Sequence, residues 1–178
     1  LKLFKDFQNR IKAMAKIHET IYRSNALNKI DSKNYIEAIL SNLVKTYRIK
    51  SNRIKINLNI QSILLEINKA IHIGLIFNEL VSNAFKYAFP DTRRNSEKID
   101  KLDIVFIKLS DRDLLINVQD NGVGFPEDAP SENLNSLGMR IVRTSVRQLK
   151  GRMHIENRGG AVVEIILPKS ALINPKNP

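Results

Sequence analysis

The sequence contains no cysteine and no tryptophan, and only three histidines. The absence of cysteine excludes disulfide bonds and thiolate metal sites, and it fits a reducing compartment, so we expect a cytoplasmic location. No apolar run approaches the roughly 18 residues that a membrane-spanning helix needs. Residues 1–10 also lack the apolar stretch and the cleavage site of a signal peptide. We therefore expect no membrane segment in these 178 residues.

Positive charge is plentiful but unevenly distributed. The formal net charge is +11, yet 13 of the 29 Lys and Arg residues and only 4 of the 18 Asp and Glu residues fall within residues 1–56. The rest of the chain is close to neutral. A nucleic-acid-binding protein would concentrate its basic residues on a recognition helix or an aromatic-bearing sheet. A basic nucleic-acid-binding protein is thus a disfavoured alternative, and we expect no specific nucleic-acid partner.

Residues 3–24 carry apolar side chains at alternating spacings of three and four. The positions are Phe4, Phe7, Ile11, Met14, His18 and Ile21. This heptad spacing predicts a helix with one apolar seam, which needs partner helices to bury it. The pattern indicates part of a helical bundle that forms between chains.

The remaining periodicities predict a single domain of alternating helices and strands. Asp31 or Ser32 is expected to cap a helix over 33–47, and further helices are expected over 68–88 and 138–150, the last one capped by Gly151. Strands are expected over 53–60, 63–67, 102–109, 114–120, 152–157 and 161–167, with a loop over 91–101. The economical arrangement is an α/β (α+β) two-layer sandwich, a mixed sheet covered on one face by helices. We divide the chain into a bundle helix (1–25), a globular domain (31–168) and a tail (169–178).

The helix expected over 68–88 must be largely buried, yet one side of its second half is polar. Glu79, Asn83, Lys86 and Tyr87 lie on or beside one line of that helix. Buried polar groups need partners, and a carboxylate, an amide oxygen and an ammonium suit a hydrated Mg²⁺ and a chain of phosphates. The alternative is an ordinary solvated helix face.

Two glycine-containing stretches follow. Asp120-Asn121-Gly122-Val123-Gly124 comes after a strand, and we expect Gly122 to adopt a positive φ and Gly124 to allow close approach of the backbone to a ligand. The alternative is a plain hairpin turn at Asn121-Gly122. Residues 125–137 have no apolar period and predict a lid. Leu137-Gly138-Met139 then opens a helix whose backbone N–H groups suit phosphates.

An acidic helix, a D-x-G-x-G stretch and a glycine at a helix start, in that order, resemble the ATP-binding domain shared by sensor histidine kinases, DNA gyrase, Hsp90 and the MutL proteins. The sequence N-A-x-K-Y-A favours the histidine kinases. IKAMAKIHETIYRS, at residues 11–24, is similar to the second helix of the dimerisation hairpin in one histidine-kinase subfamily, which implies a homodimer formed through this helix. The resemblance covers nearly the whole chain and implies the Bergerat-type ATP-binding fold.

The resemblance also implies the ligands and the residues that hold them. It implies binding of ATP and Mg²⁺, with Asp120 accepting the adenine amine, Asn83 as the Mg²⁺ ligand and Glu79 at the catalytic position. The implied ATP-binding residues are Asn83, Lys86, Tyr87, Asp120, Gly122, Gly124, Leu137, Gly138 and Met139. One position departs from the family pattern, because Ala161 stands where a threonine hydroxyl usually supports the adenine-binding aspartate.

The function implied is transfer of the γ-phosphate of ATP to a histidine, for relay to the receiver domain of a response regulator. In the subfamily concerned the acceptor lies on the first hairpin helix, which is expected before Leu1. We interpret His18, on the apolar seam, as a packed histidine; the alternative is that it is the acceptor. A MutL-like ATPase, an anti-sigma-type kinase and a degenerate nucleotide-binding interaction module are less favoured functions that the sequence leaves open.

Overall fold

The computed structural model describes residues 29–49, 53–90, 99–110, 112–126, 136–168 and 170. The helix expected over 3–24, the interior of the lid at 127–135, most of the loop expected over 91–101 and nearly all of the tail lie outside the described residues. Among the described residues, no helix has both the length and the apolar character that crossing a membrane requires.

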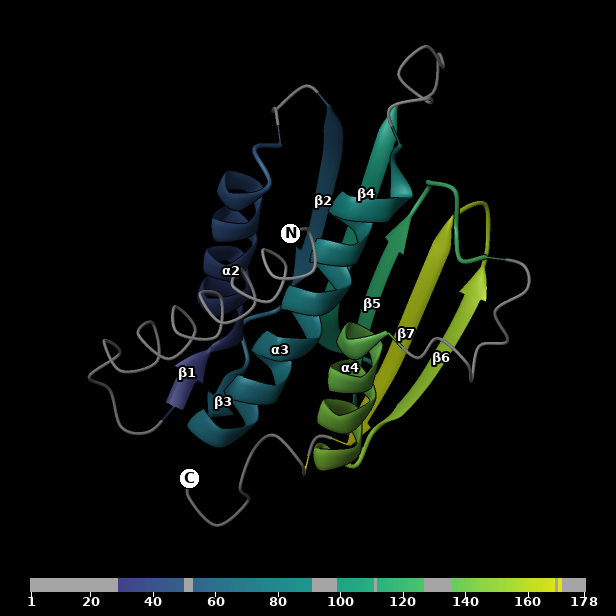
Figure 1. The fold of residues 1–178 in the computed structure, drawn as a ribbon. Helices are drawn as coiled ribbons and strands as arrows, with labels where there is room; N and C mark the ends of the chain where they lie inside the picture. Colours follow the sequence, from purple (N-terminus) through teal and green to yellow (C-terminus); the bar gives the residue numbers. More distant parts are fainter. Residues whose placement is uncertain are drawn as a thin grey trace.

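A mixed five-stranded sheet forms one layer of the molecule. Its strands lie in the order β2-β4-β5-β7-β6 (Figure 1). Their bounds are β2 Ile54–Ile60, β4 Asp100–Lys108, β5 Asp113–Asp120, β6 Arg152–Asn157 and β7 Ala161–Pro168. β2 and β4 pair in parallel, whereas the other neighbours are antiparallel. The strands expected over 102–109, 114–120, 152–157 and 161–167 are thus present, and they pair as two hairpins, β4–β5 and β6–β7.

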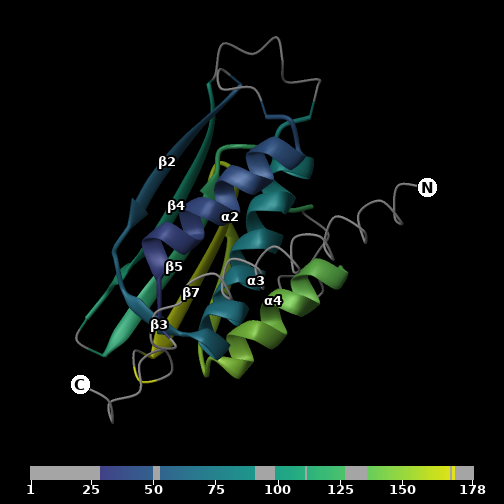
Figure 2. The same ribbon diagram turned by 90° about the vertical axis from the view of Figure 1, so that its left-hand side faces the viewer.

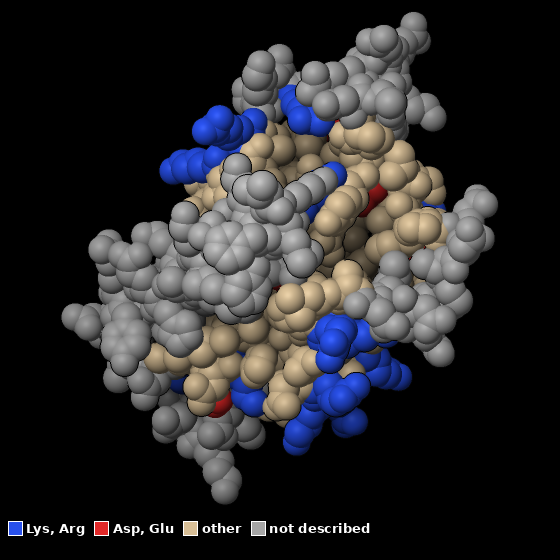
Figure 3. Space-filling model, in the orientation of Figure 1, with Lys and Arg blue, Asp and Glu red and all other residues tan. Residues whose placement is uncertain are grey.

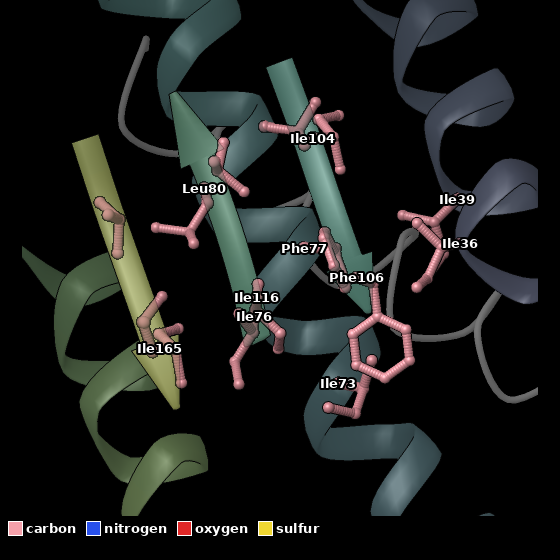
Figure 4. Packing of buried hydrophobic residues seen from close by; sticks show 14 of the residues in the cluster. Ile36, Ile39, Ile73, Ile76, Phe77, Leu80, Ile104, Phe106, Ile116 and Ile165 are labelled. Carbon is pink, nitrogen blue, oxygen red and sulfur yellow. The ribbon is translucent and has the colours of Figure 1, made fainter. Parts of the chain in front are cut away.

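In the part of the chain that the structure describes, three helices form the second layer. They are α2 Ser32–Thr46, α3 Ile67–Asn83 and α4 Leu137–Gln148, and all three cover the same face of the sheet (Figures 1 and 2). The expected two-layer sandwich is therefore confirmed. The core lies between the layers, where Phe77 of α3 meets Phe106 of β4 edge to face at 6.2 Å between ring centroids (Figure 4). Ile36 and Ile39 bring α2 into the same core.

A second, two-stranded sheet was not expected. β1 (Lys29–Asp31) pairs antiparallel with β3 (Leu64–Glu66), so the strand expected over 63–67 stands outside the main sheet. Asp31 ends β1 and caps α2, because its carboxylate accepts the N–H of Asn34 at 2.9 Å. The expected cap is thus confirmed, but three residues were too short a pattern to reveal β1.

The helix expected over 68–88 changes geometry before it ends. α3 stops at Asn83, and Ala84–Ala88 continue as a single π-helical turn, η1. Such turns are rare and often lie at functional sites. Here the change of pitch begins directly after Asn83 and covers Lys86 and Tyr87, so it determines where these two side chains point.

The end of α4 differs from the expectation in one residue. Lys150, not Gly151, adopts the left-handed conformation, with φ +54°. The N–H of Lys150 donates to Arg147 O and that of Gly151 to Val146 O, both at 2.9 Å, which is the Schellman pattern of helix ends. Gly151 is required for space, because a Cβ there would lie 2.4 Å from Leu167 Cδ2.

Candidate functional site

Asp120 is the last residue of β5 and is buried, with only 6% of its surface exposed. Its Oδ1 accepts the backbone N–H of Gly122 at 2.8 Å and that of Ala161 at 3.1 Å. A buried carboxylate is tolerated only where donors stabilise its charge. The two backbone donors therefore fix both the position and the orientation of this acceptor group at the end of the strand.

The loop after Asp120 packs against the end of η1. The N–H of Val123 donates to Ala88 O at 3.0 Å, and a Cβ on Gly122 would lie 2.3 Å from that same oxygen. Gly122 was expected to take a positive φ, but this is wrong, because the residue with a positive φ is Gly124, at +77°. Gly122 is needed for close packing of the loop on η1, not for an unusual backbone angle.

Asn121 secures the other side of the loop. Its side chain donates to Ile99 O at 2.9 Å and accepts the N–H of Lys101 at 2.7 Å. The N–H of Asn121 also donates to Lys101 O at 3.2 Å. The start of β4 is thereby tied to the residue that follows Asp120. Since the next described element after β5 is α4 and not a strand paired with β5, the alternative of a plain hairpin turn at Asn121-Gly122 is wrong.

Glu79 and Asn83 lie one turn apart on α3. Glu79 is fully buried, and its Oε1 accepts from the amide of Asn78 at 3.4 Å. Asn83 is half-buried, and its Nδ2 lies 3.9 Å from Sδ of Met139. The contact between Asn83 and Met139 brings the polar line of α3 to the first turn of α4.

Lys86 lies on the α2 side of η1, and Tyr87 is exposed. The Nζ of Lys86 lies 5.7 Å from the centroid of the Tyr47 ring, just beyond α2, and α2 and α4 flank α3 on opposite sides (Figure 1). Tyr87 is 59% exposed. The structure therefore joins Asn83 to Met139 directly, whereas the contact shown for Lys86 is with Tyr47 of the α2 end.

The start of α4 presents free backbone donors. Ser136 caps the helix by accepting the N–H of Met139 at 3.2 Å. Leu137 is half-exposed, while Gly138 and Met139 are buried. Lys and Arg side chains gather over α4 (Figure 3), where Arg140, Arg143 and Arg147 lie along the helix. A helix start with nearby cations favours an anionic ligand.

The residues present fit a bound nucleotide with its metal. Asp120 is a fixed acceptor suited to an amine donor, Asn83 offers the oxygen chemistry that Mg²⁺ prefers, and α4 offers donors for phosphate. Two residues that the sequence did not single out also contribute. Asn157 bonds to the backbone of Phe125, and Tyr47 contacts Lys86. No local sequence pattern marks them, because both come from elements distant in the chain.

Family models match both parts of the chain. Residues 68–171 match the model described as "Histidine kinase-, DNA gyrase B-, and HSP90-like ATPase", and residues 1–47 match one described as "Histidine kinase". The match over residues 68–171 covers nearly all of α3, η1, the Asp120 loop, α4 and the final hairpin. It thus contains every candidate site residue named from the sequence.

Individual relatives agree with these models. Blue-light-activated histidine kinase 2 of Erythrobacter litoralis is 28% identical over 170 residues, which are 94% of this chain and 48% of the relative. The nitrate/nitrite sensor protein NarX of Escherichia coli is 29% identical over 114 residues, which are 64% of this chain and 17% of the relative. The chain therefore spans about half the length of the first relative and less of the second.

Solved structures show the same fold. The histidine kinase domain of the Erythrobacter litoralis EL346 blue-light activated histidine kinase matches with a TM-score of 0.78 and 27% identity, covering 92% of this chain and 74% of that one. The mycobacterial sensor histidine kinase MprB, at 15% identity and a TM-score of 0.59, covers 79% of this chain and 97% of that one, and it shows the fold alone. The chain belongs to the histidine kinase-, DNA gyrase B- and HSP90-like ATPase family, and within it to the histidine kinases.

Proposed function

We propose that this chain binds Mg-ATP and donates the γ-phosphate to a histidine, for relay to the receiver domain of a response regulator. The observation that carries the proposal is the buried Asp120 carboxylate, held by two backbone N–H groups at the end of β5. An acceptor fixed in this way can take the exocyclic amine of adenine, and guanine offers no donor at that position.

The other site residues supply contacts to the phosphates and the metal. Asn83 would bind Mg²⁺ through its side-chain oxygen, and the first turn of α4 with Gly138 would face the phosphates. Mg²⁺ would neutralise charge that develops on the β- and γ-phosphate oxygens. Lys86, whose ammonium lies over the half-buried ring of Tyr47, would turn from that ring to meet a phosphate.

Glu79 is proposed to act on the attacking group. It is fully buried one turn before Asn83, so its carboxylate is shielded from solvent and interacts strongly with nearby charge. In a kinase the attacking group is an imidazole nitrogen. A carboxylate there would hold the imidazole in the tautomer whose free nitrogen faces the γ-phosphate, and it would stabilise positive charge on the ring.

We infer that the acceptor is none of the histidines in this chain. His72 precedes Asn83 by eleven residues on the same helix, so it lies about 16 Å away along the axis. His154 is on the edge strand β6, beside Glu156 at 3.8 Å. His18 lies outside the described residues, and its seam position in the sequence favours a packed role. The acceptor is then expected on a further helix of the dimer's bundle.

Residues 31–168 are proposed as the ATP-binding unit and residues 1–25 as part of a cytoplasmic dimerisation bundle. α2 belongs with the former, because Tyr35, Ile36 and Leu43 are buried in the core shared with α3 and the sheet. On this division the site is complete within one chain, whereas the acceptor is presented by the bundle. Binding and transfer can therefore be tested separately.

Incubation with γ-labelled ATP and Mg²⁺ tests this proposal. The chain should bind Mg-ATP yet acquire no acid-labile, alkali-stable label, because the nucleophile must lie in line with the γ-phosphate at near-attack distance. Addition of a bundle helix that carries an acceptor histidine should restore labelling. Stoichiometric label on residues 1–178 that disappears in His18→Ala would identify His18 as the acceptor and contradict our assignment.

A further inference from the structure

Asn157 contacts the Asp120 loop from the turn end of the β6–β7 hairpin. It is the last residue of β6, 33 residues after Gly124 in the sequence. Its Oδ1 accepts the N–H of Phe125 at 2.8 Å, and its Nδ2 donates to Phe125 O at 2.9 Å. One side chain thereby satisfies both backbone groups of Phe125, as a neighbouring strand would.

The contact between Asn157 and Phe125 also requires a glycine at position 124. A Cβ at position 124 would lie 2.6 Å from Oδ1 of Asn157, closer than carbon and oxygen can approach. The φ of Gly124, +77°, is also in the region that other residues avoid. The last glycine of D-x-G-x-G was expected to make room for a ligand, but in this structure it makes room for Asn157.

The hairpin also holds the beginning of the loop. The N–H of Ala161 donates to Oδ1 of Asp120, and a Cβ on Gly160 would lie 2.1 Å from Asp120 O. Asn157 and Ala161 face each other in the β6–β7 register. The two residues that close the turn thus fix opposite ends of the same loop, Asp120 at one end and Phe125 at the other.

We propose that Asn157 is a positioning residue for nucleotide binding, which acts by holding the Gly124–Phe125 backbone in the conformation that completes the Asp120 loop. The proposal rests on the proposed ATP-binding function, and it adds a residue that does not itself touch the nucleotide. Because Phe125 also packs its ring against the core, the hydrogen bonds select its backbone orientation more than its location.

Removal of the Asn157 side chain should affect the rest of the site through this loop. Between the two fixed ends, Val123 bonds to Ala88 at the end of η1, and η1 carries Lys86 and Tyr87. Without the side chain of Asn157, Phe125 must find water or other partners, and several backbone conformations become open to Gly124. Nucleotide binding then has to restore the ordered conformation, which lowers the apparent affinity.

The first test is Asn157→Ala, with Asn57→Ala as the matched control. Asn57, on the opposite edge strand β2, donates to Asp103 at 2.6 Å in an exposed pair. The Asn57→Ala variant therefore also loses a side-chain hydrogen bond, but at a position far from the Asp120 loop. Titration with a fluorescent ATP analogue should show about three- to tenfold weaker binding for Asn157→Ala and wild-type binding for Asn57→Ala. Amide hydrogen exchange at Phe125 should accelerate only in Asn157→Ala.

Asn157→Asp provides a second readout that does not depend on the alanine variant folding well. At neutral pH its carboxylate accepts from Phe125 N–H but opposes Phe125 O, so ATP binding should be weaker than in wild type. Protonation at lower pH gives the carboxyl group one donor and one acceptor, as in asparagine. The ratio of variant to wild-type dissociation constants should therefore approach one as the pH falls.

The outcomes separate the two proposals. A wild-type chain that does not bind ATP would refute the proposed function. If wild type binds, equal affinity in Asn157→Ala, or an equal loss in Asn57→Ala, would refute the role of Asn157 alone. A pH-independent ratio for Asn157→Asp would likewise overturn the hydrogen-bond account.

Discussion

The backbone N–H of Ala161 donates to Oδ1 of Asp120 at 3.1 Å. The resemblance to the family had suggested that a threonine hydroxyl is missing at this position. The hydrogen bond shows that residue 161 still supports the carboxylate through its main chain, which any residue other than proline would provide. With alanine at position 161, the hydroxyl that could support Asp120 is missing, but the backbone N–H still donates to its carboxylate.

Ala161→Thr should accordingly leave adenine binding unchanged or strengthen it. Ala161 is half-buried, and threonine is favoured in strands, so the variant should fold. The added hydroxyl can contribute a further hydrogen bond, worth about 0.5–1.5 kcal/mol. Calorimetric titration with Mg-ATP measures the change, and markedly weaker binding by a folded Thr variant would show that residue 161 is not beside the nucleotide.

Two adjacent glycines in the β6–β7 turn make a matched pair. Both have positive φ, but a Cβ on Gly159 meets nothing within 4 Å, whereas a Cβ on Gly160 would lie 2.1 Å from Asp120 O. Gly159→Ala should cost about 1–2 kcal/mol of stability through backbone strain and leave ATP affinity as it is. Gly160→Ala should in addition displace Asp120 and weaken ATP binding. Thermal unfolding measures the loss of stability in both variants, and titration measures their ATP affinity. Equal ATP affinities for Gly159→Ala and Gly160→Ala would show that the contact between Gly160 and Asp120 does not matter for binding.

Lys86→Ala should distinguish phosphate contacts from base contacts. If Lys86 leaves the Tyr47 ring to meet a phosphate, its loss should weaken ATP binding while the affinity for adenosine stays the same. Lys45→Ala, in the last turn of α2, is a control that removes an exposed ammonium of the same kind. Competition titrations with ATP and adenosine provide the comparison. A parallel loss of both affinities would place Lys86 in a structural role instead.

His72 gives the fold a pH dependence. It lines a groove of about 390 Å³ between α3 and α4, together with Arg140, and its Nδ1 is buried without a hydrogen bond among the described residues. Burial, with a smaller contribution from Lys69, lowers the pKa of His72 below its usual 6.5. The unfolded chain thus binds this proton more readily, so His72 reduces stability as the pH falls below about 6.5 and through the folded-state pKa.

His72→Leu removes this titrating group and fits an apolar groove. Relative to wild type, the variant should gain stability as the pH is lowered from 7.5 to 5.5, measured as the difference between urea midpoints. An identical pH dependence in wild type and His72→Leu would show that His72 is not responsible.

The core strands and helices could be predicted from sequence because their side-chain periods are regular. β5, and β4 between Leu102 and Ile107, alternate buried and half-exposed residues, and the apolar stripe of α4 marks its inner side. β1 could not be predicted, because Lys29–Asp31 is three residues long and forms only by pairing with β3. The π-helical turn at Ala84–Ala88 could not be predicted from the sequence either, because its apolar residues also fit a continued α-helix.

The site could be predicted only as far as local motifs extend. Asp120, Asn83 and Gly138 belong to recognisable stretches, and in the structure α3 contacts α4 through Asn83 and Met139 while the Asp120 loop contacts Ala88 of η1. Asn157 ends an exposed edge strand and looks like an ordinary polar residue, because its role depends on a partner 32 positions away. Gly122 and Gly124 were identified as necessary, but their reasons, contact with Ala88 and with Asn157, follow only from tertiary packing.

The central claim is that Asp120 recognises adenine, and Asp120→Asn tests it most directly. The amide can still accept from Gly122 and Ala161, but it offers a donor where adenine needs an acceptor. Asp113→Asn, at the other end of β5, is the matched control. Titration with a fluorescent ATP analogue should show about ten- to a hundredfold weaker binding for Asp120→Asn, which is the loss of about 1.5–3 kcal/mol, and no change for Asp113→Asn. Equal dissociation constants for wild type and a folded Asp120→Asn variant would remove Asp120 from the nucleotide site and contradict the account.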